Sequence, residues 1–262
     1  MTIELAYCTW GLSGNDEEIL DHVAKADILW IDIRAGDFTH QAGSDRIRKR
    51  SLQISCLGAS FGVPPEIALD SGDRSERLRA VRHVESTVLR ANQLGLNIVY
   101  VVPGKDVSEN GLVRYTESLT HIADYASDLG VRVGIEHFPG TALPTIAATL
   151  AFLRGVGHPN LYLLLDIGHA QMSGEDVPAA IADAGPLLGY VHLDDNDGMG
   201  DQHLALYDGV LTESSLRATF AALNAHGYSG RASLELHPRL PDPLDALYRS
   251  RDAALAAMEV GY

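Results

Sequence analysis

Short apolar runs rich in β-branched residues recur along the whole chain, and stretches with a helical pattern of apolar positions separate them. This alternation is typical of βα units that build a parallel sheet. The pattern predicts eight strands, at residues 3–8, 28–33, 52–57, 97–102, 132–137, 161–166, 190–194 and 232–236.

The stretches between the strands repeat their apolar residues at helical spacing. In residues 73–92, for example, Val81, Val84 and Val88 recur every three or four positions, and Gly95 follows as a stop signal. Further helices are predicted at residues 15–25, 44–50, 108–129, 145–154, 177–184, 213–225 and 244–258.

Eight strands that alternate with helices fit either a closed barrel or an open doubly wound sheet. The open sheet usually carries a G-x-G-x-x-G phosphate loop at its first turn, whereas this chain has CTWGLSGND there. A length of 262 residues matches the roughly 250 residues that a closed barrel uses as one domain. We therefore expect an α/β fold, a (β/α)8 TIM barrel, with residues 1–262 as a single domain.

The charge and the apolar content exclude several classes of protein. The formal net charge is −15, and nucleic-acid binding depends on Lys and Arg, so no nucleic-acid partner is expected. None of the lysines falls within a predicted strand, which argues against a Schiff-base aldolase. No apolar run reaches the roughly 18 residues of a membrane span, and the opening MTIELAYCTW lacks a signal-peptide pattern. We expect a cytoplasmic protein that acts on a small molecule without contacting membranes. Assembly into a homo-oligomer is compatible with the sequence.

Ionisable residues stand at the ends of the last four predicted strands: Glu136, Asp166, His192 and Glu235. Catalytic residues of a TIM barrel project from the carboxyl ends of its strands, so these four should meet at one point. Buried carboxylates are costly without compensation, and no Lys or Arg is adjacent to any of the four in sequence. A divalent cation would compensate them, Mn²⁺ first, with Mg²⁺, Co²⁺ or Zn²⁺ as alternatives. The alternative is that each group is separately hydrogen-bonded.

A second group of polar residues follows the same strands. His169 comes three residues after Asp166, and the loop after the seventh strand, DDNDGMGDQH, contains Asp201 and His203. Most aspartates of that loop are expected to form turns. His169, Asp201 and His203 are expected to bind substrate hydroxyls, and a second metal site is the alternative.

Three further residues follow predicted strands and are expected to line a substrate pocket: Trp10, Arg34 and His137. Packing in the core or at the rim is the alternative for Trp10. No glycine-rich phosphate loop follows the seventh or eighth strand, which favours a substrate without a phosphate group.

Four segments together resemble the xylose isomerase-like TIM barrels, which include sugar isomerases and epimerases, inosose dehydratases and apurinic endonucleases of the endonuclease IV type. The segments are GIEHFPGT, LLLDIGHAQ, YVHLDDNDGMGDQHLALYDGVL and ASLELHP. The resemblance covers nearly the whole chain. It implies that Glu136, Asp166, His192 and Glu235 ligate one metal and that His169 contacts substrate oxygens.

Two departures from this family narrow the expected function. The endonucleases take extra zinc ligands from histidines after early strands, whereas the third and fourth predicted strands end here in CLGAS and VVPGK. The similar ketose 3-epimerases carry an arginine shortly after the histidine of the seventh strand, where this chain has Asp197 and Gly198. DNA repair is therefore disfavoured, and a ketohexose substrate is not assigned.

The expected function is that of a metal-dependent isomerase or epimerase of a small sugar or keto sugar. The metal would stabilise an enediolate, with Glu136 and Glu235 as the acid/base pair. If one carboxylate removes a proton from the substrate carbon and the other returns a proton to its opposite face, the carbon is inverted and the reaction is an epimerisation. If one group both removes and returns the proton, the carbonyl moves and the reaction is an isomerisation. A lyase that eliminates from the same enediolate is the alternative, followed by an endonuclease-like barrel and a non-catalytic sugar-binding barrel.

Overall fold

The computed structural model describes residues 3–38 and 41–259. Among these residues, eight strands are hydrogen-bonded in chain order and close into a parallel barrel. The strands are β1 (Glu4–Cys8), β2 (Trp30–Arg34), β3 (Gln53–Gly58), β4 (Ile98–Val101), β5 (Arg132–Glu136), β6 (Leu161–Asp166), β7 (Leu188–Leu193) and β8 (Arg231–Leu234). This topology is the expected (β/α)8 TIM barrel.

Nine α-helices accompany the strands in the described ranges: α1 (Asp16–Lys25), α2 (Gln41–Lys49), α3 (Arg74–Gln93), α4 (Glu109–Asp128), α5 (Ile146–Val156), α6 (Ile167–Met172), α7 (Val177–Ala184), α8 (Glu213–Ala225) and α9 (Pro243–Glu259). All but α6 were predicted within three residues of these bounds. No described helix has both the length and the apolar content needed to cross a membrane.

Helix α6 arises because the last residue of β6 also caps a helix. Asp166 has extended backbone angles, and its Oδ1 accepts the backbone N–H of His169 at 2.7 Å. Such a cap satisfies an amide that lacks a partner within the helix. His169 is thereby held one turn away from Asp166, on a short helix that leads out of the strand.

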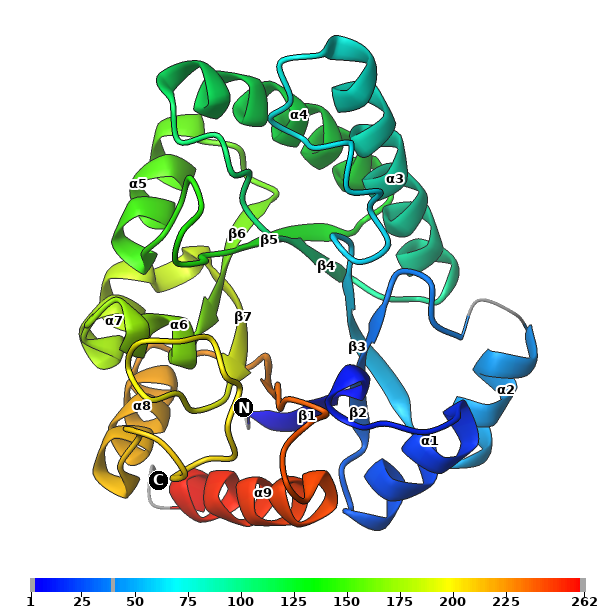
Figure 1. Ribbon diagram of the computed structural model, residues 1–262, viewed down its shortest axis with the longest axis vertical. Coiled ribbons are helices and arrows are strands. Elements are labelled where there is room, and N and C mark those ends of the chain that lie inside the picture. The colour runs from blue at the N-terminus through cyan, green and yellow to red at the C-terminus, as the bar shows by residue number, and fades with distance from the viewer. Residues whose placement is uncertain (1–2, 39–40, 260–262) are drawn as a thin grey trace. The chain divides into compact units, whose positions relative to one another are not determined.

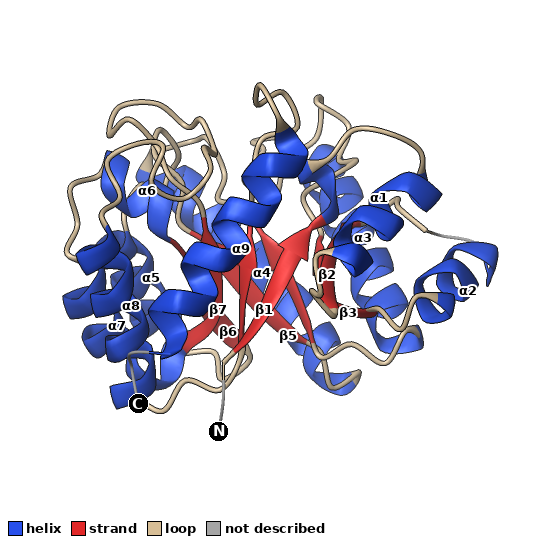
Figure 2. Cartoon of the chain, turned by 90° about the horizontal axis from the view of Figure 1, so that it is seen from below, coloured by secondary structure: helices blue, strands red, loops and turns tan. Residues whose placement is uncertain are grey.

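The chain divides into two compact units. The first unit holds β1, most of β2, β7 and β8, with α1, α2 and α6 to α9. In its sheet, Cys8 pairs with Asp32 on β2, and His192 on β7 pairs with Ser233 on β8. Helix α9 packs on β1 and β8 and beside α8 (Figure 1). Figure 2 shows α9 alongside β1, which agrees with its packing on that strand.

The second unit holds β4 and β5, the adjoining parts of β3 and β6, and α3 to α5. Helices α3 and α4 pack side by side (Figure 1). The buried Tyr115 of α4 donates its hydroxyl to the Val102 carbonyl at 3.1 Å, which ties the helix to the end of β4. Strand β5 pairs with β6 up to Glu136 and Leu164, so Glu136 is fixed at the carboxyl end of its strand.

Candidate functional site

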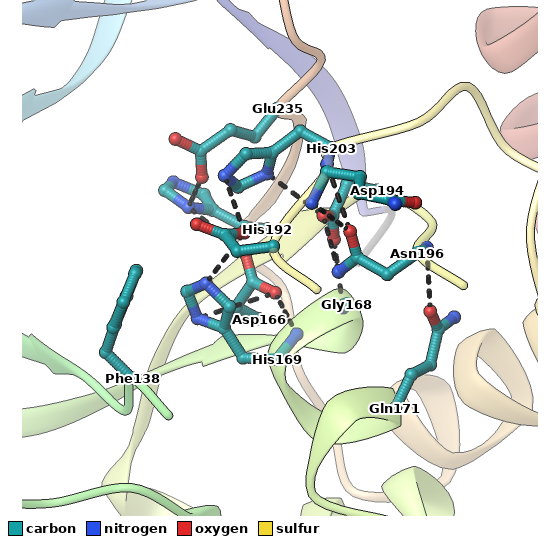
Figure 3. A network of polar contacts seen from close by, with 12 residues as sticks. Phe138, Asp166, Gly168, His169, Gln171, His192, Asp194, Asn196, His203 and Glu235 are labelled. Carbon is teal, nitrogen blue, oxygen red and sulfur yellow. Dashed lines mark hydrogen bonds and ion pairs between the residues drawn. The ribbon is translucent and has the colours of Figure 1, made fainter. Parts of the chain in front are cut away.

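Three of the four predicted metal ligands meet in the first unit, where β6, β7 and β8 end. Asp166 is the last residue of β6, His192 lies in β7, and Glu235 directly follows β8. His192 Nδ1 lies 2.6 Å from Glu235 Oε2 and 3.9 Å from Asp166 Oδ2 (Figure 3). All three residues are buried, and Glu235 has the largest exposed fraction, 7%.

The donor atoms of this cluster fit a divalent cation. The contact between His192 Nδ1 and Glu235 Oε2 is short, yet Oε2 accepts no hydrogen bond in the described structure. A buried carboxylate needs a positive partner, and a cation between these atoms would supply it. One imidazole and two carboxylates, one atom from each, form a ligand set that Mn²⁺, Co²⁺ or Zn²⁺ accepts.

The fourth predicted ligand, Glu136, belongs to the second unit. It is the last residue of β5 and is only 4% exposed. Its register partner on β6 is Leu164, which precedes Asp166 by two residues along the same strand. The structure thus buries Glu136 at a strand end as expected, and its place in the ligand set stays a prediction.

The second predicted group forms a continuous chain of ionisable side chains beside the first. His169 Nε2 lies 3.4 Å from Asp201 Oδ1, and the same oxygen lies 3.0 Å from His203 Nε2. His203 Nδ1 in turn lies 3.0 Å from Asp194 Oδ2 (Figure 3). The structure therefore brings His169, Asp201 and His203 together, as predicted. Their binding of substrate hydroxyls or of a second metal stays a prediction.

The protonation equilibria of this region follow from its buried opposite charges. Burial alone would raise the pKa of Glu235, but the neighbouring His192 and His203 outweigh it and lower the pKa. Burial alone would lower the pKa of His203, but the carboxylates of Glu235, Asp194 and Asp201 raise it. The pKa of Asp201 is held below its usual range, because its two histidine partners outweigh its burial. Glu235 and Asp201 are thus favoured in their ionised forms.

Asp194 is a residue of this site that the sequence did not single out. We expected most aspartates of the loop after β7 to form turns, but Asp194 is fully buried and accepts the Gly168 N–H at 2.9 Å. Burial and the charge of Asp166 raise the pKa of Asp194. Its position directly after an apolar strand was the available signal. Asp197 does form a turn, since it accepts the backbone N–H groups of Met199 and Gly200.

The loop after β7 is held in place by the side chain of Asn196. Its carbonyl oxygen accepts the N–H of Gln202 at 2.6 Å and that of His203 at 3.0 Å. His203 has a φ of 45°, in the left-handed region that few residues other than glycine adopt. These bonds hold the backbone in that region and so fix the direction of the His203 imidazole.

The three residues expected to line a substrate pocket have different surroundings. Trp10 is 8% exposed, and its Nε1 donates to Glu235 Oε1 at 2.8 Å, so it orients a predicted ligand. Arg34 ends β2, and its guanidinium lies 5.0 Å from the centre of the Phe61 ring. His137 follows β5 and is fully buried. Their contact with substrate stays a prediction.

A second residue that the sequence did not single out is Asp32, in the middle of β2. It is fully buried and lies 3.6 Å, through Oδ2, from His192 Nε2. The only sequence signal was a lone carboxylate within the apolar segment WIDIR.

Comparison with known proteins agrees with the barrel fold. The chain is 29% identical over 242 residues to the L-ribulose 3-epimerase of Mesorhizobium japonicum, covering 86% of this chain and 78% of that protein. It is 37% identical over 190 residues to the D-psicose 3-epimerase of Agrobacterium fabrum, covering 66% of this chain and 65% of that protein. The solved structure of an L-ribulose 3-epimerase superposes with a TM-score of 0.83 at 21% identity, covering 99% and 96% of the two chains.

The family is shown by a sequence model described as the xylose isomerase-like TIM barrel. This model matches residues 20–257, which include every residue of the ionisable cluster described above. The chain therefore belongs to the xylose isomerase-like TIM barrel family.

Proposed function

We propose that the protein is a divalent-metal-dependent epimerase of a small keto sugar. The observation that carries this proposal is the buried contact of His192 with Glu235 beside Asp166, at the ends of three barrel strands. The relatives named as L-ribulose 3-epimerase and D-psicose 3-epimerase support a ketose as the substrate class. The partner is therefore a small carbohydrate.

The cation would be held by Asp166, His192 and Glu235, with Glu136 as the fourth ligand. Mn²⁺ is the first choice, and Mg²⁺, Co²⁺ or Zn²⁺ would also fit oxygen and imidazole donors. When bound, such a cation supplies a positive charge that draws electrons from the carbonyl oxygen of the sugar and makes the neighbouring proton more acidic.

Glu136 and Glu235 form the proposed acid/base pair. One carboxylate removes the proton from the carbon beside the carbonyl, and the other returns a proton to the opposite face, which inverts that carbon. Trp10 holds one oxygen of Glu235 by a hydrogen bond and thereby orients the carboxylate. Return of the proton by the same group, at the neighbouring carbon, would give an isomerisation instead.

His169, Asp201 and His203 are proposed to bind the sugar hydroxyls. Their imidazole and carboxylate groups offer both donors and acceptors, which is what a hydroxyl group requires. His169 is 1% exposed and its backbone N–H is held by the cap at Asp166, so this residue is already in place before substrate arrives. Such preorganisation lowers the entropy cost of binding.

We also propose that residues 1–262 act as one domain. The family model extends from residue 20 to residue 257, and the similar L-ribulose 3-epimerase structure covers 99% of the chain. The proposed site residues also come from both ends of the chain, since Trp10 follows β1 and Glu235 follows β8.

Deuterium exchange tests the proposed reaction. The purified protein, loaded with Mn²⁺, is incubated in D₂O with L-ribulose, D-psicose and other five- and six-carbon ketoses, and products are followed by NMR and mass spectrometry. An epimerase inserts one deuterium at the inverted carbon of an intact sugar. A lyase yields an unsaturated product instead. Metal-loaded protein that produces neither result with any ketose of the panel would overturn the proposal, and Glu235→Gln is the inactive control.

A further inference from the structure

Asp32 is anchored within the first unit by hydroxyl groups from two other strands. Its Oδ1 accepts the Tyr190 hydroxyl of β7 at 2.7 Å, and it also accepts the hydroxyl of Ser55 in β3. The two O–H donors thus converge on the same oxygen of this buried side chain. They also fix the plane of the carboxylate, so the direction of the second oxygen is determined.

That second oxygen faces the predicted metal ligand His192. Asp32 Oδ2 lies 3.6 Å from His192 Nε2 and 3.7 Å from Cys8 Sγ, which donates to it. The opposite ring nitrogen, Nδ1, is the atom that lies 2.6 Å from Glu235. The two nitrogens of one imidazole therefore face two carboxylates that lie on different sides of the ring.

The ring of His192 is also held sterically. The rings of Tyr190 and His192 meet edge to face, with centroids 5.8 Å apart and planes inclined at 85°. These residues are two positions apart on β7, so their side chains project to the same face of the strand. Tyr190 thus contacts the imidazole with its ring and Asp32 with its hydroxyl, and it couples the positions of both.

We propose that Asp32 is a positioning residue whose charge favours the N–H of His192 on Nε2 and so favours Nδ1 as the atom that binds the cation; this inference rests on the metal site of the proposed function. At 3.6 Å the contact is longer than a hydrogen bond and acts through charge. A carboxylate beside one nitrogen favours the tautomer with its N–H on that side, and it makes the other nitrogen a better donor to a metal. Asp32 thus acts on the site without entering the ligand set.

The first test compares metal affinities. Asp32→Asn keeps the size of the side chain but removes its charge, and the dissociation constant for Mn²⁺ is measured by competition with a chelator. We expect binding that is about 10- to 100-fold weaker, the range found when outer partners of metal ligands are changed. Asp70→Asn is the matched control, since Asp70 is 4% exposed and accepts the backbone N–H of Asp106 in the second unit. Its dissociation constant should stay within about twofold of the wild type.

The second test needs no variant and therefore does not depend on the folding of Asp32→Asn. In wild-type protein labelled with ¹⁵N-histidine and loaded with diamagnetic Zn²⁺, long-range ¹H–¹⁵N spectra show which nitrogen of His192 carries the proton. We expect Nε2, and a proton on Nδ1 would overturn the inference.

The outcomes separate the two proposals. Wild-type protein that binds no divalent cation would overturn the proposed function and this inference with it. Wild-type protein that binds the cation, together with a folded Asp32→Asn variant of equal affinity, would overturn this inference alone. A purely structural role for Asp32 would lower the melting temperature of the variant without changing its affinity for Mn²⁺.

Discussion

At the scale of single residues, Gly168 shows how tightly the carboxylate region is packed. A Cβ atom at Gly168 would lie 2.3 Å from both carboxylate oxygens of Asp194 and 2.5 Å from Asn196 Nδ2. Both side chains hold His203: Asp194 contacts its imidazole, and Asn196 accepts its backbone N–H. Only glycine therefore lets α6 approach the loop after β7 without displacing the histidine.

We predict that Gly168→Ala lowers the free energy of unfolding by about 1–3 kcal/mol, the usual cost of adding a methyl group to a full interior. Urea denaturation measures the change. Gly155→Ala in α5 is the control, because its Cβ would meet nothing within 4 Å. In the control, the loss of glycine from a helix should raise stability by roughly 0.5–1 kcal/mol. Equal effects of the two substitutions would contradict the packing argument.

A second prediction at this scale concerns the proposed base. Glu136→Gln should lower kcat/KM by roughly 10²–10⁴-fold, the usual contribution of a general acid or base, and it should also weaken metal binding. The change removes a ligand charge and a proton acceptor while it keeps the shape of the side chain. Near-normal turnover of the metal-loaded variant would show that the assignment is wrong.

The neighbouring histidine should respond differently, because it is proposed to contact substrate rather than metal. In His169→Ala, metal content should stay stoichiometric while kcat falls or KM rises. Elemental analysis combined with steady-state kinetics separates these effects. Loss of one metal equivalent in the variant would instead place His169 in a ligand shell.

At the scale of elements, the helices and strands were predictable because their apolar positions repeat with distinct periods. The short helix α6 was not, since six residues are too few to establish a period, and its cap, Asp166, was interpreted only as a ligand. Asp32 was missed for a different reason. Its hydroxyl partners Ser55 and Tyr190 are 23 and 158 positions away in sequence, so only the folded sheet brings them together.

Another element-level feature is the tie between α9 and the loop after β7. Arg249 of α9 binds both oxygens of Asp208 at 2.7 and 2.8 Å, and its Nε donates to Asp245 at 2.7 Å. Paired bonds between a guanidinium and a carboxylate have a fixed geometry. Arg249 thus joins the C-terminal helix to the loop that carries Asp201 and His203.

We predict that Arg249→Ala lowers stability at pH 7 by no more than about 1 kcal/mol, since solvent screens this pair, and lowers the melting temperature by roughly 2–4 °C. Arg249 holds the pKa of Asp208 below its usual range. A carboxyl group whose pKa is lower in the folded protein than in the unfolded chain stabilises the fold at pH values above its unfolded-state pKa. This stabilisation is lost as the pH falls through the folded-state pKa. The difference between wild type and variant should therefore shrink below about pH 4, as thermal unfolding at several pH values would show. A difference that stays constant down to pH 3 would contradict this account.

At the scale of the whole molecule, the net charge of −15 favours the cation and disfavours anionic substrates. A negative protein raises the local concentration of divalent cations and repels phosphorylated sugars at low ionic strength. This agrees with the absence of a glycine-rich phosphate motif in the sequence after the last two strands. Charge, motif and cluster thus favour the same class of substrate, a neutral sugar bound with a divalent cation.

The final prediction concerns the contribution of the cation to the stability of the fold. A metal that binds only the folded protein stabilises it by RT ln(1 + [L]/Kd), about 2.7 kcal/mol at a hundredfold excess over Kd. For a chain of this size, removal of the metal with a chelator should lower the melting temperature by roughly 5–10 °C, and Mn²⁺ or Co²⁺ should restore it. Because protons compete with the cation for imidazole and carboxylate ligands, the apparent affinity should fall as the pH drops from about 8 to about 6.

The Asp70→Asn variant should show the same metal-dependent shift in melting temperature as the wild type, whereas Glu235→Gln should lose most of that shift. A melting temperature that ignores chelator and metal across this pH range, in protein shown to contain metal at the start, would exclude the proposed ligand set.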